Sequence, residues 1–298
     1  MAQPDFNNEA ILSWLGYFSQ HSQLDLGTLK ILDITRENKN IIPAVQSSRQ
    51  VLVLTDAGHP DIFYDMWDAG LGSCDIWYNE GSEPVGPVKH DKLQDMIDRG
   101  INAPAAMLIT NKDYRSTYQI GLSNQQFCNG SIRYVSSEIR AVIMSKLQAE
   151  LRDAILTVGA ASIAVEAALV AAEGTLVAVE HTRQDCATME ENAKQFGLNN
   201  VNVVGSIQEA ERFPAPSTAF LVASPYLEQE IEAQVRRNPG VRLFVYTLEF
   251  SQLTAIPAIF QRHGITLTEA VQLGVSRLGA KGEMEREPAP WLISGQVR

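Results

Sequence analysis

Short apolar runs alternate with amphipathic segments along the first third of the chain, and this alternation predicts strands and helices in turn. Aliphatic runs rich in β-branched residues predict strands at residues 29–34, 51–55, 74–81 and 105–110. Helical spacing of apolar residues covers residues 9–20, 61–69 and 90–100. Gly70 and Gly100 stand where two of these helices are expected to end. The pattern therefore predicts a layered α/β unit.

A polar, irregular stretch at 111–133 separates this unit from the remainder and predicts a domain boundary. We accordingly divide the chain into residues 1–115 and 116–298. Ser136 and Ser137 then predict the start of a helix, because small hydroxyl side chains favour the N-cap position.

The second part repeats a more regular pattern, with a helix after most strands. Its strand candidates are residues 154–160, 175–181, 201–205, 218–224 and 241–248. Two further strands near 265–275 and 291–294 close the chain as a hairpin. Repeated strand–helix units predict a doubly wound, Rossmann-like sheet that binds its ligand at the carboxyl ends of the strands.

Composition and charge narrow the classes of protein. The 298 residues carry a formal net charge of −11, which argues against a nucleic-acid partner. The three cysteines are far apart and the five histidines share no ligand spacing, so we expect reduced thiols and no metal site. No signal peptide is visible, and the most apolar run, 158–172, is too short for a membrane span. We expect a cytoplasmic protein that does not bind membranes.

The candidate ligand-binding residues lie in and near the first loop of the second part. Gly159, Ala161 and Ser162 follow the first strand there, where small residues let the backbone approach a ligand. Glu180 follows Gly159 by 21 residues, at the end of the next strand, a spacing typical of an acid that binds a ribose. A solvated acid at a strand end is the alternative. His181 and Ser206 are further candidates for the same pocket, although a histidine in a surface loop needs no ligand.

Residues from about 127 to 295 resemble the precorrin-6Y C(5,15)-methyltransferase family of cobalamin biosynthesis. The resemblance rests on the segments 127–140, 177–204, 275–277 and 290–295. The segments 40–60, 69–81 and 105–110 resemble the C-terminal subdomain of the tetrapyrrole-methylase part of the same enzyme, in the order of the fused protein. The resemblance implies a class I methyltransferase that uses S-adenosylmethionine and a tetrapyrrole ligand, and it implies a homo-oligomer.

This chain departs from the family pattern in its cofactor loop, which usually reads Asp-x-Gly-x-Gly-(Ser/Thr)-Gly. Thr157 replaces the acid, and Ala161 and Ile163 replace two glycines. We expect Ile163 to occupy ligand volume and to fit poorly where φ is positive. The segment 223–225 replaces a glycine pair, and an expected Asn near the fifth strand is missing. We also expect the first part to lack the first tetrapyrrole-methylase subdomain.

Two hypotheses follow from these departures. One is a corrin methyltransferase with an unusual cofactor loop, and the other is an inactive paralogue that acts as a binding or scaffold protein. No catalytic residue can be named from the sequence. The basic side chains that could face an acid-rich tetrapyrrole are Arg133, Arg140, Arg183 and Arg277, each of which could instead be a solvated charge.

Overall fold

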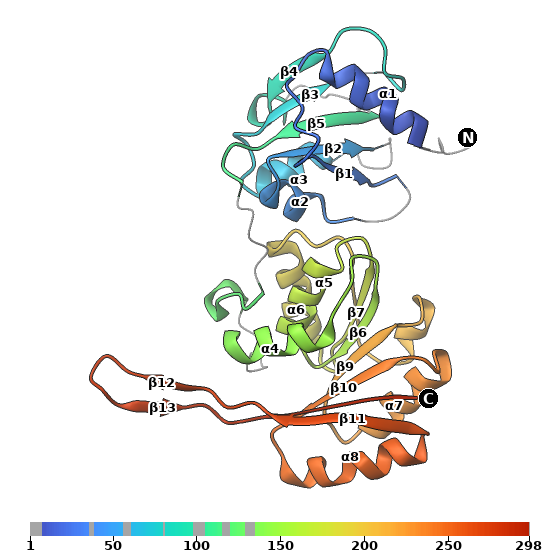
Figure 1. Ribbon diagram of the computed structural model, residues 1–298, viewed down its shortest axis with the longest axis vertical. Helices are drawn as coiled ribbons and strands as arrows, with labels where there is room; N and C mark the ends of the chain where they lie inside the picture. Colours follow the sequence, from blue (N-terminus) through green and yellow to red (C-terminus); the bar gives the residue numbers. More distant parts are fainter. Residues whose placement is uncertain are drawn as a thin grey trace. The chain divides into compact units, whose positions relative to one another are not determined.

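The computed structural model describes residues 8–35, 39–55, 61–79, 81–97, 105–114, 120–128 and 135–297. The chain forms two compact units (Figure 1). Unit 1 comprises Met1–Tyr118 with Gln195–Asn199, and unit 2 comprises Gln119–Lys194 with Asn200–Arg298.

Unit 1 is built on a five-stranded mixed sheet in the order β1-β2-β5-β3-β4, in which only β1 and β2 run parallel. Its elements are α1 (Asn8–Ser19), β1 (Lys30–Asp33), α2 (Ile41–Ser47), β2 (Gln50–Leu54), α3 (Ile62–Asp68), β3 (Asp75–Tyr78), β4 (Lys89–Lys92), the 3₁₀ turn η1 (Leu93–Asp95) and β5 (Ala106–Thr110).

Helices cover both faces of this sheet, which explains why its central strands are continuous apolar runs. Trp14 and Phe18 of α1 pack on Leu52 and Leu54, whereas Val51 on the other face packs with residues of α2 and α3. Every residue of β2 is buried. A strand buried on both faces loses the alternation of a half-exposed strand.

One sequence prediction for unit 1 is wrong, and one helix was missed. Residues 90–92 belong to the edge strand β4, paired antiparallel with β3, and not to a helix. Leu93 and Met96 are buried and give this stretch a helical spacing, but the strand is followed by the 3₁₀ turn Leu93–Asp95 and not by an α-helix up to residue 97, where the described residues end. Helix α2 was not predicted, because its Pro43 reads as a break although proline is tolerated in a first helical turn. The predicted helix end at Gly100 lies outside the described residues.

Unit 2 contains a seven-stranded sheet in the order β11-β14-β10-β9-β6-β7-β8. Strands β8, β7, β6, β9 and β10 run parallel, and β14 pairs antiparallel with both β10 and β11. The strands are β6 (Ala154–Val158), β7 (Thr175–Val179), β8 (Val201–Val204), β9 (Thr218–Val222), β10 (Arg242–Thr247), β11 (Ile265–Gln272) and β14 (Trp291–Val297). Strand order reverses at β6, so the carboxyl ends of β6 and β9 flank a topological switch point, where ligands bind in such sheets.

Helices cover the two faces of this sheet. Helices α7 and α8 bury Leu227, Ile231 and Phe260 with one face of the strands, while α5 packs on β6 and β7 from the other. The helical elements are η3 (Asn124–Gln126), α4 (Ser137–Leu147), α5 (Ala161–Val170), α6 (Arg183–Gln195), η4 (Glu209–Arg212), α7 (Leu227–Arg237) and α8 (Phe250–Arg262). The predicted doubly wound, Rossmann-like sheet of the second part is confirmed.

An extended arm, which the sequence analysis did not predict, interrupts the terminal hairpin of unit 2. Strands β12 (Ser276–Leu278) and β13 (Met284–Arg286) pair antiparallel and project beyond the sheet (Figure 1). Leu278 and Met284 on the arm are exposed. Among the described residues, no helix has the length and apolar character needed to cross a membrane.

Candidate functional site

The loop between β6 and α5 has the backbone geometry of a close-approach turn. Gly159 has φ +63°, a left-handed conformation that favours glycine, and its N–H donates to the Val179 carbonyl at 3.0 Å. Helix α5 begins two residues later, and its N-cap residue, Ala160, provides no side-chain cap. The first N–H groups of α5 therefore lack an acceptor within the helix and are available to an anionic group.

Ile163 does not lie in this turn. It is the third residue of α5 and is fully buried, and the only described non-glycine residue with positive φ is Gln148. The strain that we expected at Ile163 is thus absent, because the helix starts before the position of the last family glycine. Ala161 and Ser162 are also buried in the first turn of α5, so the loop itself is only two residues long.

Glu180, at the carboxyl end of β7, is the most perturbed acid of the site. Its side chain is 1% exposed, and Oε1 has no hydrogen-bond partner. Burial, helped by the charge of Asp185 and opposed by a hydrogen bond from the Ala160 backbone, raises the pKa of Glu180 to about 8. The hydrogen bond joins Glu180 to the turn at Gly159, so the structure brings these two predicted residues together. A buried carboxyl with an unused oxygen next to a ligand loop can accept hydroxyl hydrogens.

His181 points to a different partner. Its Nε2 lies 3.1 Å from Oε1 of Glu230, and its ring is 5.9 Å from that of Tyr226. Glu230 is 1% exposed, and burial raises its pKa against the opposing influence of His181. Sequence analysis missed Glu230, because an acid in the first turn of an amphipathic helix usually faces water.

Ser206 lies just beyond β8 and is half-buried. Its Oγ accepts a hydrogen bond from the Glu209 N–H at 3.3 Å. Of the positions where the chain departs from the family pattern, Thr157 is fully buried in β6 and its Oγ1 has no hydrogen-bond partner.

Within the described parts of the chain, no three His, Cys, Asp or Glu side chains form a group that could hold a metal ion.

Two of the basic residues proposed for a tetrapyrrole, Arg140 and Arg277, pair with acids of the same chain. Arg140 is fully buried, and its Nε lies 2.5 Å from Oε1 of Glu166, so the expectation that it could face a ligand is wrong. Arg277 is bound to Glu138 and Glu287 at the base of the arm. Arg183 is exposed at the start of α6, and Arg133 lies outside the described residues.

Comparison with known families gives a match over more than half of the chain. The model of the precorrin methyltransferase domain matches residues 130–288, which lie in unit 2 except for Gln195–Asn199 and include Gly159 and Glu180. The chain belongs to the precorrin methyltransferase domain family. This membership confirms the resemblance inferred for the second part, whereas the likeness of residues 1–115 to the tetrapyrrole methylases stays a prediction.

Solved structures agree with the fold of this family. A precorrin-6Y C5,15-methyltransferase from Geobacter metallireducens is 23% identical, with a TM-score of 0.56 over 60% of this chain and 98% of the other. A precorrin 8W decarboxylase from Methanobacterium thermoautotrophicum is 20% identical, with a TM-score of 0.52 over 59% of this chain and 100% of the other. At these identities the likeness shows the fold alone. A comparison with curated protein sequences found no match.

Proposed function

We propose that this precorrin methyltransferase domain binds S-adenosylmethionine at the carboxyl ends of β6 and β7 and transfers its methyl group to a carbon of a tetrapyrrole ring. The observation that carries the proposal is the buried Glu180 carboxyl, whose free Oε1 lies beside the turn at Gly159. A nucleoside presents two ribose hydroxyls, which are the donors that such an oxygen lacks.

The residues present fit this cofactor at the ribose and at the loop. Gly159 has no side chain that could cover the backbone of the turn. A Cβ atom built at this position would meet no other atom closer than 3.7 Å, so neighbouring side chains do not crowd the turn. The first turn of α5 offers uncapped N–H groups to a carboxylate. Ile163 does not contradict the proposal, because it lies in α5 and not in the turn, and its side chain is fully buried.

The protein's part in the reaction is to bind, orient and exclude water. S-adenosylmethionine supplies a methyl group on a positively charged sulfur. Glu180 would hold the ribose and lose its proton as the hydroxyls donate to it, because hydrogen bonds to the carboxylate favour the charged form. The pair of His181 and Glu230 lies beyond Glu180 toward α7 and would border the acceptor. Catalysis would come from positioning within the site.

Calorimetric titration of the full chain with S-adenosylmethionine and S-adenosylhomocysteine tests the proposal. We expect micromolar binding, and we expect Glu180→Gln to weaken it about tenfold to a hundredfold, the value of hydrogen bonds to a charged group. Glu191→Gln, the same change at an exposed acid of α6, is the matched control. No heat from the folded wild-type protein at millimolar ligand would instead identify an inactive paralogue that acts as a binding or scaffold protein.

The homo-oligomer implied by the family resemblance is part of this proposal. The β12–β13 arm exposes Leu278 and Met284 far from the core of its own unit, and such side chains are suited to a contact with a second copy. Light scattering during gel filtration would measure the mass. A wild-type protein that elutes as a monomer at micromolar concentration would remove the oligomer from the proposal.

A further inference from the structure

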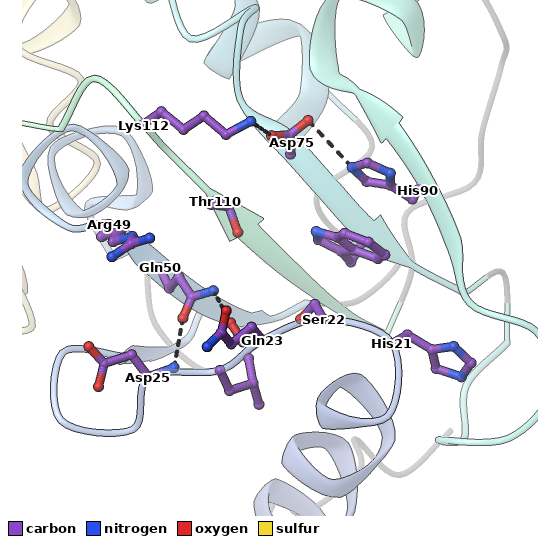
Figure 2. Close-up of a pocket in the computed structure, with 12 residues that line it drawn as sticks. His21, Ser22, Gln23, Asp25, Arg49, Gln50, Asp75, His90, Thr110 and Lys112 are labelled. Carbon is purple, nitrogen blue, oxygen red and sulfur yellow. Dashed lines mark hydrogen bonds and ion pairs between the residues drawn. The ribbon is translucent and has the colours of Figure 1, made fainter.

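A cavity of about 730 Å³ lies on the sheet of unit 1, and neither the family match nor the proposed function involves it (Figure 2). Its floor is a polar row across three strands, because Gln50 of β2 and Asp75 of β3 both stand opposite Thr110 of β5. Helix α1 packs on Leu52 and Leu108 farther along the same face and does not extend over this row. The cavity is therefore the end of a sheet face that its helix leaves uncovered.

The rim of the cavity is fixed by hydrogen bonds. The buried Gln50 side chain accepts from the Asp25 N–H at 3.1 Å and donates to the Gln23 carbonyl at 2.9 Å (Figure 2). This holds the segment after α1 against the edge of the sheet. The Asp25 carboxylate is itself engaged within its own turn, with Gly27 and Thr28. The rim is thus held in place without a ligand.

The wall on the β3–β4 side is flat and close to neutral. The indole of Trp77 stacks on the imidazole of His90 with 3.8 Å between ring centroids and 12° between planes. Asp75 lies 2.9 Å from Nζ of Lys112 and 3.4 Å from Nε2 of His90. Burial acts to raise the pKa of Asp75, but Lys112 and His90 outweigh it and hold that pKa below its ordinary value. The Lys112 charge is therefore already balanced.

Three donors that line the cavity remain unused. The Arg49 guanidinium and the Thr110 hydroxyl form no hydrogen bond or ion pair with the described residues, and the buried Ser22 Oγ has no partner. Arg49 stands at the β2 side, across β5 from the Trp77–His90 wall (Figure 2). A guanidinium binds carboxylates and phosphates through paired hydrogen bonds. Hydroxyl groups supplement such binding.

We propose that this cavity binds a small organic anion with a flat ring system, its carboxylate or phosphate on Arg49 and its ring against the Trp77–His90 wall. The volume lies in the range of small-molecule sites. The free cation and the aromatic wall at opposite sides select a ligand with both an anionic end and a ring. Ser22 and Thr110 add hydrogen bonds between the two. The residues of this site are different from those of the proposed cofactor site in unit 2. A negative result in one binding experiment therefore does not refute the other proposal.

The test is calorimetry of the full chain with 1-naphthyl phosphate and 1-naphthoate, which distinguish a phosphate from a carboxylate. 1-Naphthol and inorganic phosphate are the controls that lack the anion or the ring. We expect one of the two ring anions to bind at least tenfold more tightly than either control. Arg49→Gln should weaken binding by about tenfold or more, because the loss of a hydrogen bond to a charged group changes the affinity by about this factor.

Two further variants make the test specific. Thr110→Val keeps the shape of the side chain and should weaken binding several-fold. Lys92→Gln removes an exposed cation of β4 that does not line the cavity and should leave binding unchanged. Absence of binding by both ring anions at millimolar concentration would overturn the proposal. Equal binding of inorganic phosphate, or affinity unaltered in Arg49→Gln, would overturn it as well.

Discussion

The buried carboxyl of Glu180 should make the free protein less stable as the pH rises toward 8. Its pKa is about 8 in the folded chain, against 4.5 for an unperturbed glutamate, because burial disfavours the charged form. Below pH 4.5 the folded and unfolded states both hold the proton. Between these two pKa values only the folded state holds it, so stability is lost as the pH increases through this window.

The magnitude follows from the width of that window. Each pH unit in which only the folded state holds the proton costs about 1.4 kcal/mol of unfolding free energy. From pH 5.5 to 7.5, Glu180 should therefore remove about 2 to 3 kcal/mol, a large part of the stability of a typical domain. Glu180→Gln mimics the protonated acid and has no such loss. The variant should match the wild type below about pH 4.5, exceed it by about 1.4 kcal/mol at pH 5.5 and exceed it by about 4 kcal/mol at pH 7.5.

Urea denaturation followed by circular dichroism, at half-unit steps from pH 5 to 8.5 and without ligand, measures this difference. Burial also raises the pKa of Glu230, so the wild-type curve alone mixes two groups, and the comparison with Glu180→Gln isolates one. Glu191→Gln should give a curve parallel to the wild type. Parallel curves for Glu180→Gln and the wild type across the whole range would refute the reasoning.

Three other predictions follow from the same structure. Binding of S-adenosylmethionine should strengthen by up to about tenfold per pH unit between pH 6 and 8, and Glu180→Gln should abolish this dependence in calorimetry, because binding must expel the proton. Arg140→Met leaves a buried acid unpaired and should cost about 3 to 5 kcal/mol in urea denaturation, whereas Arg277→Ala, which removes an exposed ion pair, should change the stability much less. Gly174→Ala places a Cβ 2.1 Å from the Asp153 carbonyl oxygen and should cost about 1 to 3 kcal/mol by thermal unfolding; an unchanged melting temperature would contradict it.

The sequence predicted unit 2 well because its signals are local and repeated. Parallel strands such as β6 and β7 are buried on both faces and appear as apolar runs that turn residues end. In unit 1, β4 reads Lys-His-Asp-Lys and has no apolar alternation. Its pairing with β3 is a tertiary contact that no local pattern reveals. The arm of β12 and β13 is likewise exposed at every residue, so neither strand has a buried face to recognise.

For the site, spacing located the acid but did not reveal its environment. The 21-residue interval placed Glu180 at the end of β7 and beside the turn at Gly159. The pKa of its carboxyl depends on burial, on the charge of Asp185 and on a hydrogen bond from the Ala160 backbone, which the spacing does not locate in space. Arg140 shows the converse: a basic residue near a predicted ligand site is a structural partner of Glu166 instead. A charge seen in sequence does not show whether it faces water, ligand or another charge.

The cofactor loop shows why a glycine count is a poor measure of a nucleoside site. A glycine is required only where the backbone is left-handed or where a side chain would displace the ligand. In this chain the first condition applies at Gly159, where φ is +63°, whereas Ala161 and Ile163 already lie in α5. The alanine and isoleucine side chains at these two positions are buried. The proposed cofactor site therefore rests on the turn at Gly159 and on the Glu180 carboxyl, and not on the number of glycines in the loop.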